Sequence, residues 1–201
     1  MNLFTLVVLA YLIGSVPFAL VIGKGFYATD VREHGSRNLG ASNSGRVLGK
    51  AAGAAVMVLD AAKVFLVVIL ATCFCKDTAA VPLGGFAAAI GHCYPVFAKF
   101  KGGKAVAGLY GFLFGLFTFA GFSPWVFFLP LAVFLTVLYT TKIIALSSMI
   151  SSVVAAVYVY LAGDCLLMFG VMVVYALLII FRHRENIKRI MCGEENKISW
   201  M

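Results

Sequence analysis

A short polar segment, Gly35–Arg46, lies between long apolar stretches of this 201-residue chain. It holds three glycines, three serines, two asparagines and two arginines, and it runs into the start of a predicted helix. Glycines let backbone N–H groups converge on a ligand, serines can donate hydroxyls, and arginine can bind phosphate through two hydrogen bonds. We expect Ser42, Asn43 or Ser44 to cap the helix, whose N-terminus favours anions. This first polar segment is equally consistent with an anion site and with an ordinary Gly/Ser-rich loop.

The second polar segment runs from Gly91 to Lys104. It ends in Gly102-Gly103-Lys104, a glycine turn with a lysine at the start of another predicted helix, which again suits an anion. It is not a Walker A loop, because the first glycine and the Ser or Thr after the lysine are missing. We expect His92 to be a packed core histidine rather than a catalyst.

The third polar segment, Arg182–Arg189, follows the last apolar run. If the helix continues through it, His183 and Asn186 share a face and Glu185 can pair with Arg189 at i,i+4. His183 can titrate near neutral pH or donate to an oxyanion. A basic, membrane-anchoring helix end explains the arginines well but explains His183 and Asn186 poorly.

The composition predicts the elements that position these segments. With 63% hydrophobic and 12% charged residues, and a mean hydropathy of +1.03, the chain is far more apolar than soluble domains, which are about a quarter charged. We predict an all-α, polytopic integral membrane protein that forms one domain over residues 1–201, with the apolar N-terminus retained as a first span. About seven transmembrane helices are expected: Leu3–Ile22, Ala51–Cys75, Val81–Ala98, Ala105–Gly121, Pro124–Thr140, Ile143–Ala162 and Cys165–Phe181.

The positions of the basic residues test this seven-span topology. If the loop after the first span is cytoplasmic, 14 of the 16 Lys and Arg residues fall on that side, while the acidic Asp77 and Asp164 fall outside. This asymmetry is the positive-inside pattern, and it predicts an outer N-terminus and a cytoplasmic C-terminus. All three polar segments then emerge on the cytoplasmic face. The net charge of +8 therefore reflects membrane topology, and we expect no nucleic-acid partner.

Asp60 and Lys63 lie inside the second span, three residues apart and so on one helix face. Intramembrane charges are costly and should be paired in the interior. We favour a pair that fixes helix packing; an element of the active site or of an ion path is the alternative.

Several kinds of function find little support in the motifs. There is no GxSxG elbow, no HEXXH pattern and no acidic cluster for a divalent metal, and the five cysteines fit neither a disulfide scaffold nor a metal site. A small anion transporter would need polar groups through the membrane, often in inverted repeats. A scaffold for other lipid enzymes would leave His183 and Asn186 without a role.

Four stretches resemble one family. They are Gly14-Ser15-Val16-Pro17, Asp30-Val31-Arg32 with Gly35–Asn43, Gly91-His92 through Lys104, and Arg182-His183-Arg184-Glu185-Asn186. In this order they resemble the bacterial acyl-phosphate:glycerol-3-phosphate acyltransferases, the PlsY family, over nearly the whole chain. Arg37 and Ala105 depart from the family pattern, because glycine is common at both positions, and Ser42 replaces a frequent threonine. We expect Ala105 to lie in a helix start, where alanine is well tolerated.

The resemblance implies the transfer of a fatty acyl group from acyl phosphate to glycerol 3-phosphate, giving lysophosphatidic acid and phosphate in phospholipid synthesis. It implies no cofactor, because acyl phosphate is already activated. It places the enzyme in the bacterial plasma membrane with a cytoplasmic active site. The implied partners are the two substrates, membrane lipid and, as a candidate, the soluble enzyme that makes acyl phosphate.

The resemblance also implies site residues. Catalytic roles fall to Ser36, Lys104, His183 and Asn186, of which the last two orient the glycerol 3-phosphate hydroxyl. The general base is left open between His183 and a substrate phosphate, and a covalent route through Ser36 is less favoured because no base is visible beside it. Phosphate-binding roles fall to Gly35, Asn38, Gly40, Ser42, Asn43, Arg46, Lys101, Gly102 and Gly103.

Overall fold

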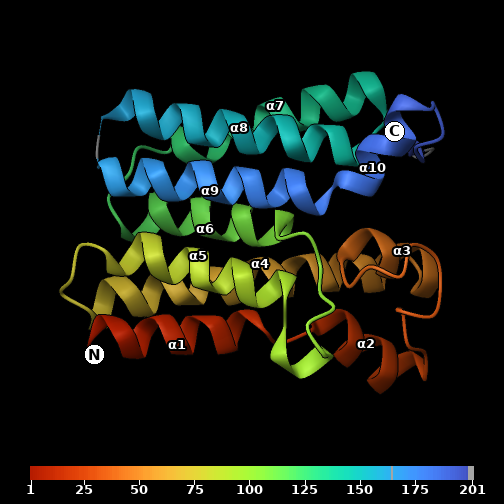
Figure 1. Ribbon diagram of the computed structural model, residues 1–201, viewed down its shortest axis with the longest axis horizontal. Coiled ribbons are helices and arrows are strands. Elements are labelled where there is room, and N and C mark those ends of the chain that lie inside the picture. Colours follow the sequence, from red (N-terminus) through yellow and green to blue (C-terminus); the bar gives the residue numbers. More distant parts are fainter. Residues whose placement is uncertain (164, 199–201) are drawn as a thin grey trace. The chain divides into compact units, whose positions relative to one another are not determined.

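The computed structural model describes residues 1–163 and 165–198, and every regular element within these ranges is helical. The chain forms two compact units, Met1–Gly115 and Leu116–Met201, and the prediction of one domain over the whole chain stays a prediction. Asp164, predicted on the outer side, lies outside the described residues. The helices are α1 (Leu3–Gly14), α2 (Phe18–Tyr27), α3 (Ala41–Leu48), α4 (Lys50–Phe74), α5 (Ala80–Cys93), the short 3₁₀ helix η1 (Val96–Ala98), α6 (Val106–Phe119), α7 (Trp125–Thr141), α8 (Ile144–Ala162), α9 (Leu166–Arg182) and α10 (Arg184–Met191) (Figure 1).

The apolar helices agree with a membrane protein. In the described part of the chain, four helical segments are long and apolar enough to cross a bilayer: Leu3–Tyr27, Lys50–Phe74, Ala80–Ala98 and Ile144–Ala162. A fifth is reached if α9 and α10 count as one span bent by 58°. The helices α6 and α7 are also apolar but have only 14 and 17 residues. The all-helical membrane class is confirmed, whereas the seven-span count and the orientation of the termini stay predictions.

The first predicted span is broken rather than continuous. Helix α1 ends at Gly14 and α2 begins at Phe18. The break has a local cause, because Pro17 has no N–H to donate and disfavours a helical conformation in the residue before it. It also lies at a close approach between α1 and α5, where a side chain at Gly14 would collide with the backbone of Ala88.

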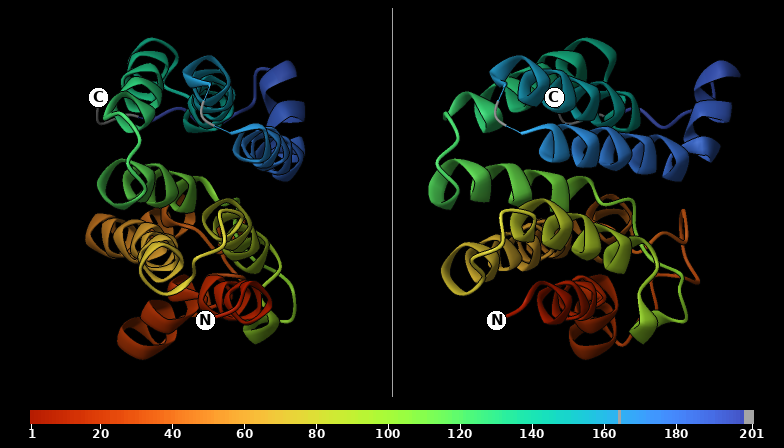
Figure 2. Two further views of the ribbon diagram at one scale, coloured as in Figure 1. Left: turned by 90° about the vertical axis from the view of Figure 1, so that its left-hand side faces the viewer. Right: turned by 60° about the vertical axis from the view of Figure 1, so that its left-hand side comes forward.

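In the first unit, α1, α4 and α5 pack against one another, and α2 and α3 pack on α4 (Figures 1 and 2). Helix α6 joins this group, because side chains at Gly111 and Gly115 would meet Ala61 and Val68 of α4. The first and second polar segments lie at the same end of the unit (Figure 1).

In the second unit, α8 packs against both α7 and α9 (Figure 1). Four serines of α8 are buried: Ser147, Ser148, Ser151 and Ser152. Each hydroxyl donates to a carbonyl one turn earlier on its own helix, for example Ser148 Oγ to the Ile144 oxygen at 2.7 Å. Small side chains with satisfied hydroxyls let apolar helices approach closely, which suits packing inside a membrane.

Candidate active site

Asp30 lies in the loop between the end of α2 and the first polar segment, and its side chain holds this part of the loop in place. Its carboxylate accepts hydrogen bonds from the backbone N–H of Arg32 at 3.0 Å and from Arg32 Nε and Nη2 at 3.0 and 2.7 Å. Lys24 Nζ lies 3.1 Å from the same carboxylate. The hydrogen bonds from the Arg32 side chain hold the pKa of the Asp30 carboxyl well below its usual range. The loop between α2 and α3 is therefore tied by an ionised carboxylate.

The Asp30→Asn variant should lower the stability of the protein by about 1–2 kcal/mol, because charge-assisted hydrogen bonds become neutral ones. Since the folded pKa of Asp30 is depressed, its contribution is present above the unfolded pKa of about 4 and is lost as the pH falls through the folded value. Thermal unfolding in detergent between about pH 2 and 7 checks both points. The difference in midpoint between wild type and variant should be constant near neutral pH and shrink only below about pH 4. An unchanged midpoint near pH 7 would contradict the prediction.

Asn43 holds the loop together from inside. It is 1% exposed; its Oδ1 accepts the Ser36 N–H at 2.8 Å, and its Nδ2 donates to the carbonyls of Val31 and His34 at 2.9 and 3.2 Å. The side-chain amide is thus used by three backbone groups of the loop. We infer that Asn43 holds the loop in shape rather than contacting a ligand, and the anion site predicted in this loop stays a prediction.

The start of α3 differs from the prediction. The N-cap residue is Gly40, and α3 begins at Ala41, so the expected capping by Ser42, Asn43 or Ser44 is wrong. The physical reason is that the Asn43 amide bonds to the preceding loop, and the chain becomes helical one residue before Ser42. Because Gly40 has no side chain to cap the helix, the amides of the first turn are left for water or a ligand.

Both departures from the family pattern fall on left-handed backbone. Arg37 has φ 58° and Ala105 has φ 60°, a region that costs ordinary residues roughly 1–2 kcal/mol and glycine almost nothing. The left-handed backbone thus explains why glycine is common at both positions in the family. The expectation that Ala105 lies inside a helix start is wrong, because α6 begins one residue later at Val106.

Replacing Ala105 with glycine should change the stability of the protein by less than about 1 kcal/mol. Relief of the left-handed conformation gains roughly 1–2 kcal/mol, while the freer unfolded chain offsets about 0.5–1 kcal/mol of it and the loss of a fully buried methyl group offsets about 0.8 kcal/mol more. The thermal midpoint in detergent measures the effect. Ala107→Gly is the matched control, because this residue lies within α6 and should lose about 1 kcal/mol. Equal losses in both variants would contradict the prediction.

The second polar segment folds back on the end of α5. After η1 the chain returns, so that the Gly103 N–H donates to the His92 carbonyl at 3.0 Å. Gly102 and Gly103 are buried, Lys104 is half-buried and Lys101 is exposed. The predicted turn before a helix is confirmed, since α6 starts two residues after Lys104.

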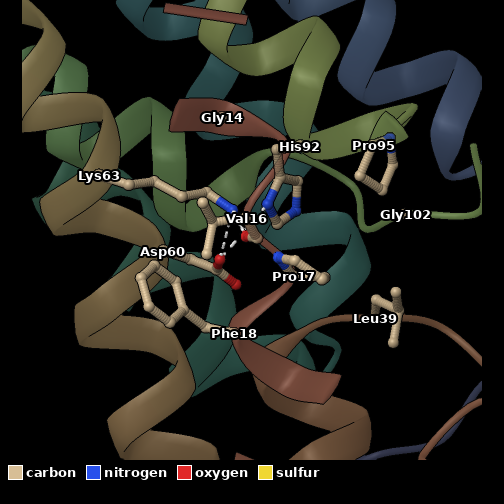
Figure 3. A pocket seen from close by; sticks show the side chains of 10 residues that line it. All are labelled: Gly14, Val16, Pro17, Phe18, Leu39, Asp60, Lys63, His92, Pro95 and Gly102. Atoms are coloured by element: carbon tan, nitrogen blue, oxygen red, sulfur yellow. Dashed lines mark hydrogen bonds and ion pairs between the residues drawn. The ribbon is translucent and has the colours of Figure 1, made fainter. Parts of the chain in front are cut away.

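The first and second polar segments meet at Gly103. A side chain there would lie 2.6 Å from the Leu39 carbonyl and would also collide with the imidazole of His92. Leu39, His92 and Gly102 line a small pocket together with Asp60 and Lys63 (Figure 3). The pocket has room for about one water molecule. Two glycine-containing turns from distant parts of the chain are therefore packed backbone to backbone.

The third polar segment is broken, so the continuous helix on which the shared face of His183 and Asn186 depended does not form. Helix α9 ends at Arg182 and α10 starts at Arg184, with a bend of 58° between them. His183 at the bend is buried, as is Asn186. His183 Nδ1 lies 2.8 Å from the Ile179 carbonyl; because a carbonyl can only accept, Nδ1 carries the proton and Nε2 of the neutral ring holds the lone pair.

Glu195 is the residue of this region that sequence reasoning missed. Its Oε1 accepts from Asn186 Nδ2 at 2.6 Å and its Oε2 from Arg189 Nε at 2.7 Å, and its side chain is 6% exposed. Arg189 thus pairs with Glu195, and the predicted pairing with Glu185 is wrong. The only sequence signal was a pair of acidic residues just after a glycine, and Gly193 has φ 72°, which turns the chain back toward α10.

The remaining predicted residues differ in exposure. Lys104, Asn38 and Gly40 are half-buried, while Gly35, Ser36, Ser42 and Arg46 are exposed. Among residues 1–163 and 165–198, no three His, Cys, Asp or Glu side chains gather as a metal ion would require. The predicted site residues offer backbone amides, lysine, arginine, a histidine, asparagines and serine hydroxyls.

Fold and site together define a membrane-embedded, all-helical protein that carries basic, glycine-turned loops suited to anionic substrates. The family model described as "Glycerol-3-phosphate acyltransferase" matches residues 4–193. A glycerol-3-phosphate acyltransferase of Listeria monocytogenes is 46% identical over 100% of this chain and 98% of its own length, and one of Bacillus subtilis is 43% identical over 98% and 97%. The chain belongs to the glycerol-3-phosphate acyltransferase family and is an acyltransferase.

Solved structures agree with this assignment. The crystal structure of PlsY (YgiH), an integral membrane glycerol 3-phosphate acyltransferase, in its glycerol 3-phosphate form is 36% identical, with a TM-score of 0.89 over 98% of this chain and 95% of that chain. Its lysophosphatidic acid form gives a TM-score of 0.87. The all-helical membrane fold that was predicted from the composition is thereby confirmed.

Proposed function

We propose that this enzyme transfers a fatty acyl group from acyl phosphate to glycerol 3-phosphate, releasing lysophosphatidic acid and inorganic phosphate. A hydroxyl oxygen of glycerol 3-phosphate forms a bond to the acyl carbon, and the bond from that carbon to the phosphate oxygen breaks. The hydroxyl proton passes to a base, and the phosphate leaves with the bonding electrons. The donor is already activated, so the reaction needs no cofactor.

The observation that carries the proposal is the packing of two glycine turns against each other at Gly103. A reaction between two phosphorylated substrates needs two anion sites close together and cations that screen their repulsion. Lys104 and Arg46 take the screening role in this proposal. The backbone amides, with Ser36, Asn38 and Ser42, bind the acyl phosphate and its developing charge.

His183 and Asn186 orient the hydroxyl of glycerol 3-phosphate in this proposal. The Nδ1 contact of His183 with the Ile179 carbonyl uses that nitrogen as a donor, and Nε2 is the general base in this version of the proposal. A substrate phosphate is the alternative base, and the enzyme then contributes mainly proximity and electrostatics. PlsY structures in glycerol 3-phosphate and lysophosphatidic acid forms support the acceptor and the product.

The seven-span topology is part of the proposal. It puts the N-terminus outside and the C-terminus inside a bacterial plasma membrane, with the polar segments in the cytoplasm. The distribution of Lys and Arg supports this orientation. The enzyme that makes acyl phosphate then delivers its product from the cytoplasm to the membrane.

The test uses the protein purified in detergent, with acyl phosphate and glycerol 3-phosphate as substrates. We expect release of phosphate and lysophosphatidic acid in equal amounts. Acyl-CoA and acyl-(acyl carrier protein) are supplied in parallel as competing donors. No product with acyl phosphate would overturn the proposal, and product from acyl-CoA alone would assign another donor.

A further inference from the structure

A charged cluster lies inside the first unit, next to the turn that holds Gly102 and Gly103. Lys63 Nζ lies 2.7 Å from Asp60 Oδ1, and the two side chains are 4% and 3% exposed. His92 Nδ1 lies 3.5 Å from the same oxygen. Lys63 also donates to the Val16 carbonyl at 2.9 Å, in the break between α1 and α2. One carboxylate thus links α4 to the end of α5 and, through Lys63, to the helix break (Figure 3).

This cluster is a poor candidate for a simple stabilising pair. Removing two charges from water is costly, and a buried ion pair often stabilises no more than well-packed apolar residues of the same size would. Because only 12% of the residues in this chain are charged, we look for a role of the cluster in positioning another part of the protein. The contacts of its third member, His92, identify that part.

His92 contacts Gly103 in two ways. Its carbonyl accepts the Gly103 N–H at 3.0 Å. Its imidazole also lies against Gly103, because a side chain built there would meet Nε2 and would lie 2.8 Å from Cε1. The ring therefore stands between the Asp60 carboxylate at one edge and the glycine turn at the other.

We propose that Asp60, Lys63 and His92 form a positioning cluster that holds the turn Gly102-Gly103-Lys104 in the shape that binds a substrate phosphate. Asp60 fixes the tilt of the imidazole through Nδ1, and Lys63 fixes the carboxylate by anchoring it to the Val16 carbonyl. The ring in turn sets where the Gly103 backbone lies. A displacement of about 1 Å can cost around a hundredfold in an enzyme site, so this support acts on substrate binding without touching substrate. The inference rests on the proposed function.

The alternative is that the pair only joins α4 to the helix break. The double variant Asp60→Asn/Lys63→Met separates the two explanations, because it removes both charges and leaves neither one buried alone. His92→Phe is a second, independent variant. It keeps the Asp60–Lys63 pair and a ring beside Gly103, and it removes the imidazole nitrogen that contacts Asp60.

The experiment measures the thermal midpoint in detergent and the KM of each substrate in steady-state transfer. We expect both variants to fold, with a midpoint near wild type, and the KM of at least one substrate to rise about tenfold or more. Lys76→Met/Asp77→Asn is the matched control, because it makes the same two changes in the exposed loop before α5 and should leave both KM values unchanged. If the double variant does not fold, the KM values of His92→Phe alone decide between the two explanations.

Wild-type KM values in both folded variants would overturn the inference, since a pair that only joins helices predicts that result. A fall in kcat with both KM values unchanged would also overturn it. The assay of the wild-type enzyme tests the proposed function separately from the role of the cluster. If only a thioester supports transfer, the acyl-phosphate proposal is wrong, and the KM comparison is made with that thioester and still tests the cluster.

Discussion

Replacing Asn43 with alanine should reduce kcat/KM by about a hundredfold or more, although Asn43 lies beneath the predicted phosphate site. The substitution leaves the Ser36 N–H and the carbonyls of Val31 and His34 without the partners that they have in the structure. Buried polar groups without partners cost roughly 1–3 kcal/mol each. We expect the free energy of unfolding to fall by about 2–4 kcal/mol, which is less than the sum over the three groups because the loop can partly rehydrate. A loop displaced by about 1 Å accounts for the lost rate.

Two further variants define what Asn43 does. Asn43→Asp keeps an acceptor for the Ser36 N–H but points oxygen at two carbonyls, so we expect it to be nearly as damaging as alanine. Asn2→Ala is the control: Asn2 also accepts one backbone N–H, from Thr5 at 2.8 Å as the N-cap of α1, and its loss should cost about 1 kcal/mol without affecting the rate.

Limited proteolysis of residues 28–40 measures the loop directly. We expect Asn43→Ala to be cut much faster than wild type and Asn2→Ala to match wild type. A raised KM with unchanged protease resistance would show instead that Asn43 binds the substrate itself. Full activity in the folded alanine variant would contradict both roles.

Local sequence rules predicted much of this protein. Long apolar runs predicted helices, and the spacing of Asp60 and Lys63 predicted a buried pair, which the structure confirms at 2.7 Å. The glycine turn before α6 followed from Gly102-Gly103-Lys104. In each case the evidence lies within a few residues of the feature, which is the range over which helix periodicity and turn chemistry act.

What sequence reasoning missed depends on contacts between distant residues. Nothing near His92 indicates that it contacts Asp60, 32 positions earlier. Glu195 reaches back to Asn186 only because the chain turns at Gly193. The left-handed backbone at Arg37 and Ala105 could not be read from residue types that rarely adopt it. Pro17 is a sequence signal for a helix break, but the apolar residues on both sides of it led to the prediction of one continuous span.

Replacing Gly103 with alanine should raise the KM of a substrate by about a hundredfold while changing global stability little. The new methyl group would lie 2.6 Å from the Leu39 carbonyl and would overlap the His92 ring. One of these neighbours is backbone and the other is held by Asp60, so the turn itself has to move. The displacement falls on residues 102–104, which carry the predicted phosphate contacts, and a shift of about 1 Å suffices for this loss.

Gly25→Ala is the matched control for Gly103→Ala, because Gly25 lies within α2 and a methyl group there meets nothing within 4 Å. It should leave KM unchanged and stabilise α2 by about 0.5–1 kcal/mol. Combining Gly103→Ala with Asp60→Asn/Lys63→Met gives a further result. If the cluster acts only through Gly103, its loss should add little once the turn has already been displaced, since residues that share one structural element are not additive. If instead the rise in KM of the combined variant equals the product of the two separate rises, Gly103 and the cluster affect KM independently of each other.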